Sequence, residues 1–390
     1  MTLDIDRLRA ETPGTGNRIH LNNAGAALMP LPVYDAVTEH LDLELAIGGY
    51  EAQARARAAF ERTYDAIAEL INCERREIAL VENATVGWQM AFYGMRFAPG
   101  DRILTAEAEY AANVIAYLQM AKRTGVRIDF VPSDTSGQMD VAALEAMIDE
   151  KVRLIAVTHI PTNGGLINPA AEIGKVARQH GIPYLLDACQ SVGQVPVDVA
   201  EIGCDMLSVT GRKYLRGPRG TGFLYVRKGF MDRLEPPFLD MHGAEWTSMS
   251  EYEMRGDARR FENWEFNIAG VIGLGVAVDY LLGLGIEVTS ARLCALAARA
   301  REKLSALPAI TVQDIGAQKG GIVTFTHAEK SADEVKALLT EKAINVSVTG
   351  VSSTRFDLEK RGLKSMVRAS FHYYNTDEEI DQLIAALAAI

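Results

Sequence analysis

Cysteine is scarce in this sequence, and its few copies lack the spacing of a disulfide framework or a metal site. Cys73, Cys189, Cys204 and Cys294 lie scattered along 390 residues without a CxxC pair or a Cys/His cluster. Each is more simply a small, buried apolar residue. The sequence therefore predicts no metal.

Long apolar runs and clustered basic residues are also missing. No run approaches the roughly 20 apolar residues of a membrane span, and the first residues, MTLDIDR, lack the basic and then apolar layout of a signal peptide. The net charge of −11 is spread along the chain, which disfavours a nucleic-acid surface. We expect a cytoplasmic protein with neither a membrane nor a nucleic-acid partner. There is no internal repeat or low-complexity segment.

Between residues 77 and 227, short β-branched runs alternate with longer amphipathic stretches. This pattern is typical of βαβ units in a doubly wound, mainly parallel sheet. Strands are predicted at residues 78–81, 102–105, 127–131, 153–158, 183–186, 206–209 and 222–226, and helices at 86–96, 113–123, 141–149 and 170–180.

The pattern changes after residue 227. Residues 236–267 lack clear periodicity and are predicted as a long loop. Helices follow at 268–285 and 289–307, then a strand at 322–326, a helix after Ser331 and a last helix from Thr376. This alternation predicts a smaller α+β C-terminal domain.

Several polar residues stand directly after predicted strands, where doubly wound sheets bind ligands. Ala84 and Thr85 lie at an expected helix N-terminus, which favours an anion such as phosphate, although a simple helix cap would use the same residue types. Asp187 ends an apolar strand and is costly to bury without a cation or strong donors. A protonated pyridine nitrogen would be such a partner, and a helix-capping aspartate is the alternative.

Lys213 follows the next strand, in the segment TGRK at residues 210–213. A lysine near a sheet terminus can be desolvated and placed among cations, which lowers its pKa and makes it a competent Schiff-base nucleophile. Thr210 and Arg212 are candidates to hold phosphate. The competing interpretation is a solvent-exposed basic turn.

Four segments in order along the chain carry a family resemblance. They are LNNAG at residues 21–25, DACQ at 187–190, the Lys213 segment through Gly222, and VRASFHYYNT at 367–376. The sequence resembles the class V aminotransferase and cysteine desulfurase family of fold-type I enzymes that use pyridoxal 5′-phosphate (PLP). That family includes selenocysteine lyases and isopenicillin N epimerases. The resemblance implies an N-terminal arm (1–20) packed with the small domain, a large PLP-binding domain (21–265), a small C-terminal domain (266–390) and a homodimer with shared active sites.

The resemblance also assigns roles to individual residues. Lys213 would form the Schiff base with PLP and move the proton at the substrate Cα, and Asp187 would pair with the pyridinium nitrogen. The other implied positions are Gln190 and Thr162 near the phenolic oxygen, Ala84, Thr85, Thr210 and Arg212 at the phosphate, Tyr110 stacked on the ring, and Arg368 with Asn23, Ala24 and Gly25 at the substrate.

Two departures from the family bear on the reaction. Residues 347–355 contain no cysteine where persulfide-forming desulfurases carry one, and Trp264-Glu265 replaces a Gly-Thr pair that reaches the neighbouring subunit's phosphate. We therefore expect β-elimination on a small amino acid with a sulfur or similar leaving group, without a persulfide. Transamination is the alternative and epimerisation the third choice. A non-catalytic PLP-binding regulatory protein is the alternative from another class.

Overall fold

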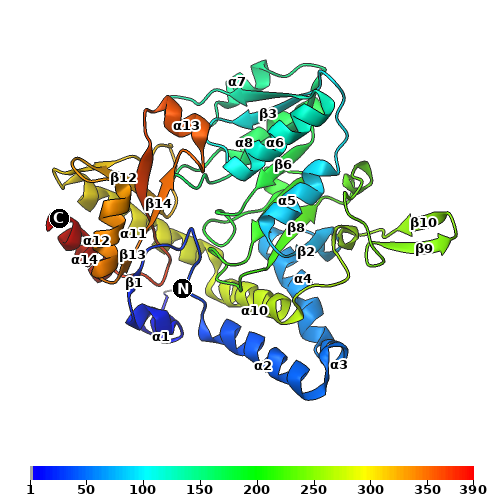
Figure 1. The fold of residues 1–390 in the computed structure, drawn as a ribbon, viewed down its shortest axis with the longest axis horizontal. Coiled ribbons are helices and arrows are strands. Elements are labelled where there is room, and N and C mark those ends of the chain that lie inside the picture. The colour runs from blue at the N-terminus through cyan, green and yellow to red at the C-terminus, as the bar shows by residue number, and fades with distance from the viewer. Residues whose placement is uncertain (1–2) are drawn as a thin grey trace.

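A seven-stranded sheet forms the centre of the molecule (Figure 1). The structure is a computed structural model that describes residues 3–390. The strand order is β2-β8-β7-β6-β5-β3-β4, and pairing is parallel except that β8 runs antiparallel to β2 and β7. The strands are β2 (Ile78–Val81), β3 (Arg102–Ala106), β4 (Arg127–Val131), β5 (Val152–Thr158), β6 (Tyr184–Asp187), β7 (Met206–Thr210) and β8 (Gly222–Val226). The large, mainly parallel sheet predicted from the sequence is confirmed.

Helices cover the sheet, so its central strands read as continuous apolar runs. Every residue of β6, β7 and β8 is buried, as expected for strands packed on both faces. The connecting helices are α5 (Ala84–Tyr93), α6 (Ala111–Thr124), α7 (Val141–Ala146), α8 (Ala170–His180) and α9 (Val199–Ile202). Helix α7 ends three residues before the predicted bound, at the Met147 C-cap.

A second helical layer lies below the sheet in Figure 1 and contains α2 (Leu31–Ile47), α3 (Gly49–Arg55), α4 (Arg57–Ile71) and α10 (Ile268–Leu284). Helix α10 packs against α2 and α4, and its buried residues belong to the same core as the large sheet. The predicted domain boundary at residues 265/266 stays a prediction, and this packing favours a boundary after α10. No single helix within residues 3–390 is long and apolar enough to span a membrane. Helix α10 passes that test only jointly with α11 (Ile286–Ser305), across a bend of 83°.

The C-terminal part has its own core around a four-stranded antiparallel sheet of order β11-β12-β15-β14. Its strands are β11 (Ile310–Val312), β12 (Ile322–His327), β14 (Ser347–Gly350) and β15 (Ser365–Ser370), and its helices are α11 (Ile286–Ser305), α12 (Ala332–Glu341), α13 (Arg355–Lys360) and α14 (Asp377–Ala388). Ser331 with Glu334 and Thr376 with Glu379 form capping boxes that start α12 and α14. The smaller α+β part agrees with the sequence prediction.

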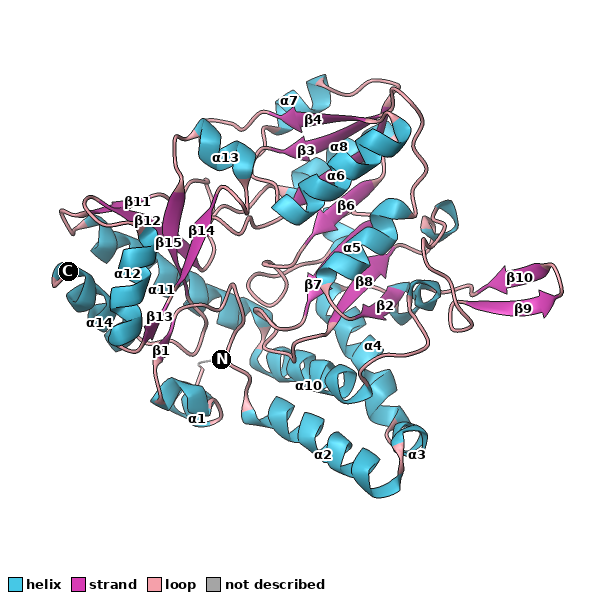
Figure 2. Ribbon diagram, viewed as in Figure 1, coloured by secondary structure: helices cyan, strands magenta, loops and turns pink. Residues whose placement is uncertain are grey.

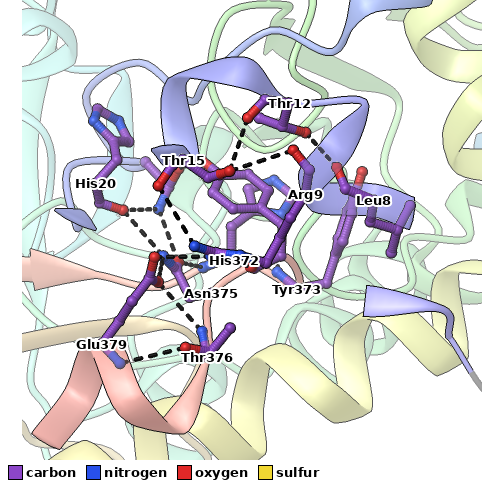
Figure 3. Close-up of polar contacts among 12 residues, drawn as sticks. Leu8, Arg9, Thr12, Thr15, His20, His372, Tyr373, Asn375, Thr376 and Glu379 are labelled. Atoms are coloured by element: carbon purple, nitrogen blue, oxygen red, sulfur yellow. Dashed lines mark hydrogen bonds and ion pairs between the residues drawn. The ribbon is translucent and has the colours of Figure 1, made fainter. Parts of the chain in front are cut away.

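The N-terminal arm is tied to the C-terminal part (Figure 3). After α1 (Ile5–Ala10), the strand β1 (Ile19–His20) pairs in parallel with β13 (Ile344–Asn345). Arg9 forms an ion pair with Glu379 at 2.8 Å, and Asn375 Nδ2 donates to the carbonyl of His20 at 3.3 Å. The arm therefore bridges residues more than 300 positions apart in the sequence.

Residues 236–267 do not form the structureless loop predicted above. They contain an antiparallel hairpin, β9 (Ala244–Ser248) with β10 (Glu251–Met254), which projects from the body of the molecule in Figure 2. Its strands are almost wholly exposed within one chain, so the apolar/polar alternation that marks a half-buried strand is missing. That is why the sequence pattern did not reveal it.

Candidate active site

The site lies at the carboxyl ends of β3, β5, β6 and β7. Strands β4 and β5 lie on opposite sides of β3, so the chain reverses its direction of winding there. Open α/β sheets bind ligands beyond the strand ends at such a reversal. The turn after β3 carries Glu109 and Tyr110, the turn after β5 carries Thr162, and Lys213 follows β7.

Asp187 is the last residue of β6 and is buried, with only 5% of its surface exposed. Its register partners are Thr158 on β5 and Ser208 on β7. Oδ1 accepts a hydrogen bond from the backbone N–H of Cys189 at 3.0 Å, and Oδ2 accepts one from Asn113 Nδ2 at 2.9 Å. These bonds hold the carboxylate in place without an ion pair among residues 3–390, which leaves its charge available to a cation.

Lys213 lies on the turn after β7 and is half-buried. Burial lowers the pKa of its ammonium, Arg212 and Arg368 lower it further, and Asp187 and Cys189 act in the opposite direction. Loss of the proton turns the amine into a nucleophile. The exposed basic turn considered above is therefore not what the structure shows.

Thr210, Arg212 and the start of α5 lie around the same turn. Arg212 Nη1 donates to Thr210 Oγ1 at 2.9 Å, and Asn83 caps α5 by accepting from the N–H of Val86 at 3.0 Å. A Cβ on Gly222 would lie 2.4 Å from the Val209 carbonyl oxygen and 3.4 Å from the Ala84 nitrogen. Glycine thus lets β8 approach the N-terminus of α5, where exposed Thr85 lies beside free backbone N–H groups.

Arg368 extends from β15 of the small sheet toward this site and is 8% exposed. Its Nε donates to Ser347 Oγ at 2.9 Å, and its Nη1 donates to the backbone and side-chain oxygens of Thr162. Thr162, which the resemblance placed near the cofactor's phenolic oxygen, therefore contacts the arginine. The two fixed nitrogens orient a guanidinium fork suited to a carboxylate.

Tyr110 caps α6, and its ring is 39% exposed. Burial raises the pKa of its phenol, with further contributions from Cys189 and Asp187 and opposing ones from Arg212 and Arg368. The side chains of Asp187, Arg212 and Arg368 therefore lie near enough to act on the charges of both Tyr110 and Lys213.

The segment LNNAG at residues 21–25 contacts the site through its backbone. Gln190 Nε2 donates to the Ala24 carbonyl at 3.1 Å, while Gln190 Oε1 is buried without a partner among the described residues. The Asn23 side chain is fully buried and bonds to the carbonyls of His20 and Ser370 and to the Tyr374 hydroxyl. Its amide therefore orders the segment, whereas Oδ1 of Asn22, next to Gly25, is buried with no partner within residues 3–390.

Sequence reasoning missed Asn22, Glu109 and Asn113. Glu109 lies in the turn directly before α6 and Asn113 lies in the first turn of that helix, where its amide reaches both Glu109 and Asp187. Two polar residues four positions apart directly after a predicted strand are the signal in the sequence that could have located them.

Residues 19–383 match the family model described as aminotransferase class-V. The chain belongs to this family. Among curated relatives, a probable cysteine desulfurase of Pyrococcus abyssi is 30% identical over 386 residues, which is 97% of this chain and 96% of the relative. A cysteine desulfurase of Pectobacterium atrosepticum is 32% identical, and the match covers 100% of this chain and 98% of the relative. Among solved structures, the apo structure of a cysteine desulfurase from Thermococcus onnurineus NA1 has a TM-score of 0.93 at 28% identity. The match covers 100% of this chain and 98% of that structure's chain.

The family settles the cofactor and the broad class. This is a PLP-dependent class V enzyme with the fold-type I architecture, as the sequence resemblance predicted. The names of its relatives do not support the prediction that a persulfide is not formed.

The residues of this site fit PLP. The lysine has a lowered pKa, the buried carboxylate lacks a cation, Gln190 Oε1 lacks a partner, and Gly222 permits close approach to a helix N-terminus. Each feature matches one part of the cofactor: its aldehyde, pyridine nitrogen, phenolic oxygen and phosphate.

Proposed function

We propose that this enzyme is a lyase that cleaves the bond between Cβ and sulfur in a small amino acid, with cysteine as the first candidate. The observation that carries the proposal is the juxtaposition of Lys213, whose pKa burial lowers, with Asp187 and the oriented guanidinium of Arg368. This set suits chemistry at the Cα of an amino acid. The choice of a sulfur leaving group is supported by the relatives named cysteine desulfurase.

The chain's own residues would act as follows. Arg368 binds the substrate carboxylate, and Lys213 removes and returns the proton at Cα. Bound PLP supplies an electron sink for the electrons of the broken Cα bond, and Asp187 keeps that sink positively charged. Tyr110 covers the ring, Gln190 contacts the phenolic oxygen, and Thr85, the Ala84 backbone, Thr210 and Arg212 hold the phosphate.

The fate of the sulfur depends on whether a protein thiolate receives it. Residues 347–355 contain no cysteine, and burial raises the pKa of the Cys189 thiol beside Lys213 to about 12. A thiol in that state is a poor nucleophile. These features support elimination with release of sulfide over transfer to a protein cysteine.

A product assay tests the proposal. We would incubate the PLP-loaded protein with cysteine and a panel of amino acids, with and without an added thiol or keto acid. Elimination yields pyruvate, ammonia and sulfide, whereas desulfuration yields alanine and transfers sulfur to a thiol. Keto-acid formation that requires an added amino acceptor would instead establish the aminotransferase alternative, and inverted enantiomers would establish epimerisation. A bound but unreactive cofactor would identify a regulatory protein.

We also propose a cytoplasmic homodimer in which the β9–β10 hairpin and Trp264-Glu265 lie near the partner's site. Trp246 and Tyr252 face each other across the hairpin and are 74% and 56% exposed, and Trp264 is 52% exposed. Exposed aromatic clusters of this kind mark interfaces. Sedimentation of the Trp246→Ser/Tyr252→Ser variant should show monomers with an unchanged circular dichroism spectrum. Monomers in the unmodified protein would contradict the assignment.

A further inference from the structure

A buried carboxyl group with no assigned role lies beside Asp187. Glu109 is 2% exposed. It accepts hydrogen bonds from the N–H groups of Tyr110 at 2.7 Å and Thr158 at 3.0 Å, and from the Thr105 hydroxyl at 3.1 Å. The Thr158 hydroxyl is a further contact. Glu109 makes no ion pair within residues 3–390, so hydrogen bonds alone compensate its burial.

Asn113 connects this carboxyl group to Asp187. Its Nδ2 donates to Glu109 Oε1 at 3.0 Å and to Asp187 Oδ2 at 2.9 Å, and the side chain is almost fully buried. An amide NH2 group has two hydrogens, so it can satisfy both carboxyl groups at once. The other oxygen of Asp187 accepts from the backbone N–H of Cys189, so Asn113 supplies the amide side-chain donor that holds this carboxylate from the opposite side.

We propose that Asn113, anchored by Glu109, is a positioning residue that orients Asp187 toward the pyridine nitrogen of PLP. The inference rests on the proposed role of Asp187. Glu109 also binds the backbone N–H of Tyr110, so the same carboxyl group fixes the ring-covering tyrosine and, through Asn113, the partner of the ring nitrogen. A shift of this pair would move two sides of the cofactor site together.

The charges around the pair are consistent with that role. Burial raises the pKa of Glu109 to about 7, and the negative charge of Asp187 acts in the same direction. Tyr117 on α6 and Tyr184 on β6 are the other titratable groups that sense Glu109, and burial keeps both phenols neutral by raising their pKa. The titratable groups that interact with the charge of Asp187 are Lys213, Cys189 and Tyr110, and the fixed charge of Arg212 lies near them.

The test replaces Asn113 with an apolar residue of similar size. In the PLP-loaded protein, Asn113→Leu should weaken PLP binding about tenfold, the effect of losing one hydrogen bond to a charged group. The pH midpoint of the visible cofactor band should move to higher pH. A ring that holds less positive charge draws fewer electrons from the Schiff-base nitrogen, so that nitrogen keeps its proton to a higher pH. PLP affinity is measured by equilibrium dialysis, and folding of the apoprotein by thermal unfolding.

Asn168→Leu is the matched control. Asn168 is 1% exposed and bonds to the Thr158 carbonyl and the Met139 N–H, but not to Asp187. It should lose stability without a change in PLP affinity or band midpoint. Equal effects of the two variants on the cofactor, or a wild-type midpoint and affinity in Asn113→Leu, would overturn the proposal.

Two further variants complete the design. If Asn113→Leu fails to fold, Glu109→Gln takes its place. The NH2 group of the glutamine would face an N–H donor and so disturb either Asn113 or a backbone N–H. An unchanged midpoint of the cofactor band in Glu109→Gln would also overturn the proposal. Asp187→Asn tests the underlying role. A wild-type spectrum in Asp187→Asn would refute the proposed role of Asp187. If the spectrum changes in Asp187→Asn but not in Asn113→Leu, only the positioning role of Asn113 is refuted.

Discussion

At the scale of single residues, the site depends on buried polar groups whose partners are few and identifiable. Arg368, Asp187 and Glu109 are all less than a tenth exposed, yet within residues 3–390 none of them makes an ion pair. Hydrogen bonds replace counter-ions at each position. Such groups are sensitive to small changes, since an unsatisfied buried polar group costs about 1–3 kcal/mol.

Arg368→Lys should raise the KM for the amino-acid substrate by roughly ten- to a hundredfold, because an ammonium group cannot form the two parallel bonds of the guanidinium fork. PLP affinity should stay at the wild-type value. Steady-state kinetics and dialysis measure the two quantities. Arg153→Lys, at an exposed arginine that pairs with Asp101, is the control. An unchanged KM would remove Arg368 from the substrate site.

Glu109 should make the stability of the apoprotein depend on pH. Its pKa is about 7 in the folded chain and near 4.5 in the unfolded chain, so the folded state holds the extra proton between these values. Its contribution to stability is complete below about pH 4.5 and is lost as the pH rises toward 7. The difference in melting temperature, Glu109→Gln minus wild type, should therefore be larger at pH 8 than at pH 5. A difference independent of pH would contradict the raised pKa.

At the scale of elements, the sequence pattern predicted the buried strands and missed an exposed hairpin. All seven strands of the large sheet were found, and the signal is plainest where the strand is buried on both faces, as in β7 and β8. The β9–β10 hairpin was missed because neither face is covered within one chain. Asp187 and Lys213 follow strands and could be located, whereas the bridge from Asn113 to Asp187 joins residues 74 positions apart and depends on packing.

Gly222→Ala should weaken PLP binding more than it lowers stability. The added Cβ would lie 2.4 Å from the Val209 carbonyl oxygen on β7 and 3.3 Å from the Asn83 carbonyl carbon, so β8 would have to shift beside the N-terminus of α5. Gly283→Ala is the control, since its Cβ meets nothing within 4 Å and alanine favours a helix by about 1 kcal/mol over glycine. Phosphate-competed PLP binding and urea unfolding separate the two effects. Parallel losses of affinity and stability in Gly222→Ala would argue against a phosphate site there.

At the scale of the whole molecule, Arg216 joins segments from three parts of the chain. It is 1% exposed, with a left-handed backbone (φ 62°) three residues after Lys213. Nε donates to the Leu28 carbonyl and Nη1 to the Tyr373 hydroxyl, both at 2.8 Å, and Nη2 donates to Thr12. The guanidinium lies 4.6 Å from the Tyr374 ring centre, a cation–π contact.

Arg216→Met should lower the free energy of unfolding by about 2–4 kcal/mol, because three acceptors lose their donor and the rings lose their cation. It should also expose residues 3–18 to proteolysis. Urea unfolding and timed digestion measure these changes. Arg219→Met, at an exposed position of the same turn, should leave both unchanged. Equal behaviour of the two variants would show that Arg216 does not hold the arm.

The contacts of Arg216 have a consequence for the order in which the enzyme is made. Thr12 is synthesised more than 300 residues before Tyr373, and both contact Arg216. The turn that carries Lys213 cannot gain its final support until both are present. The same holds for β1, whose partner β13 is synthesised more than 300 residues later. A nascent chain that stops before residue 373 therefore lacks one of the contacts that hold the turn carrying Lys213.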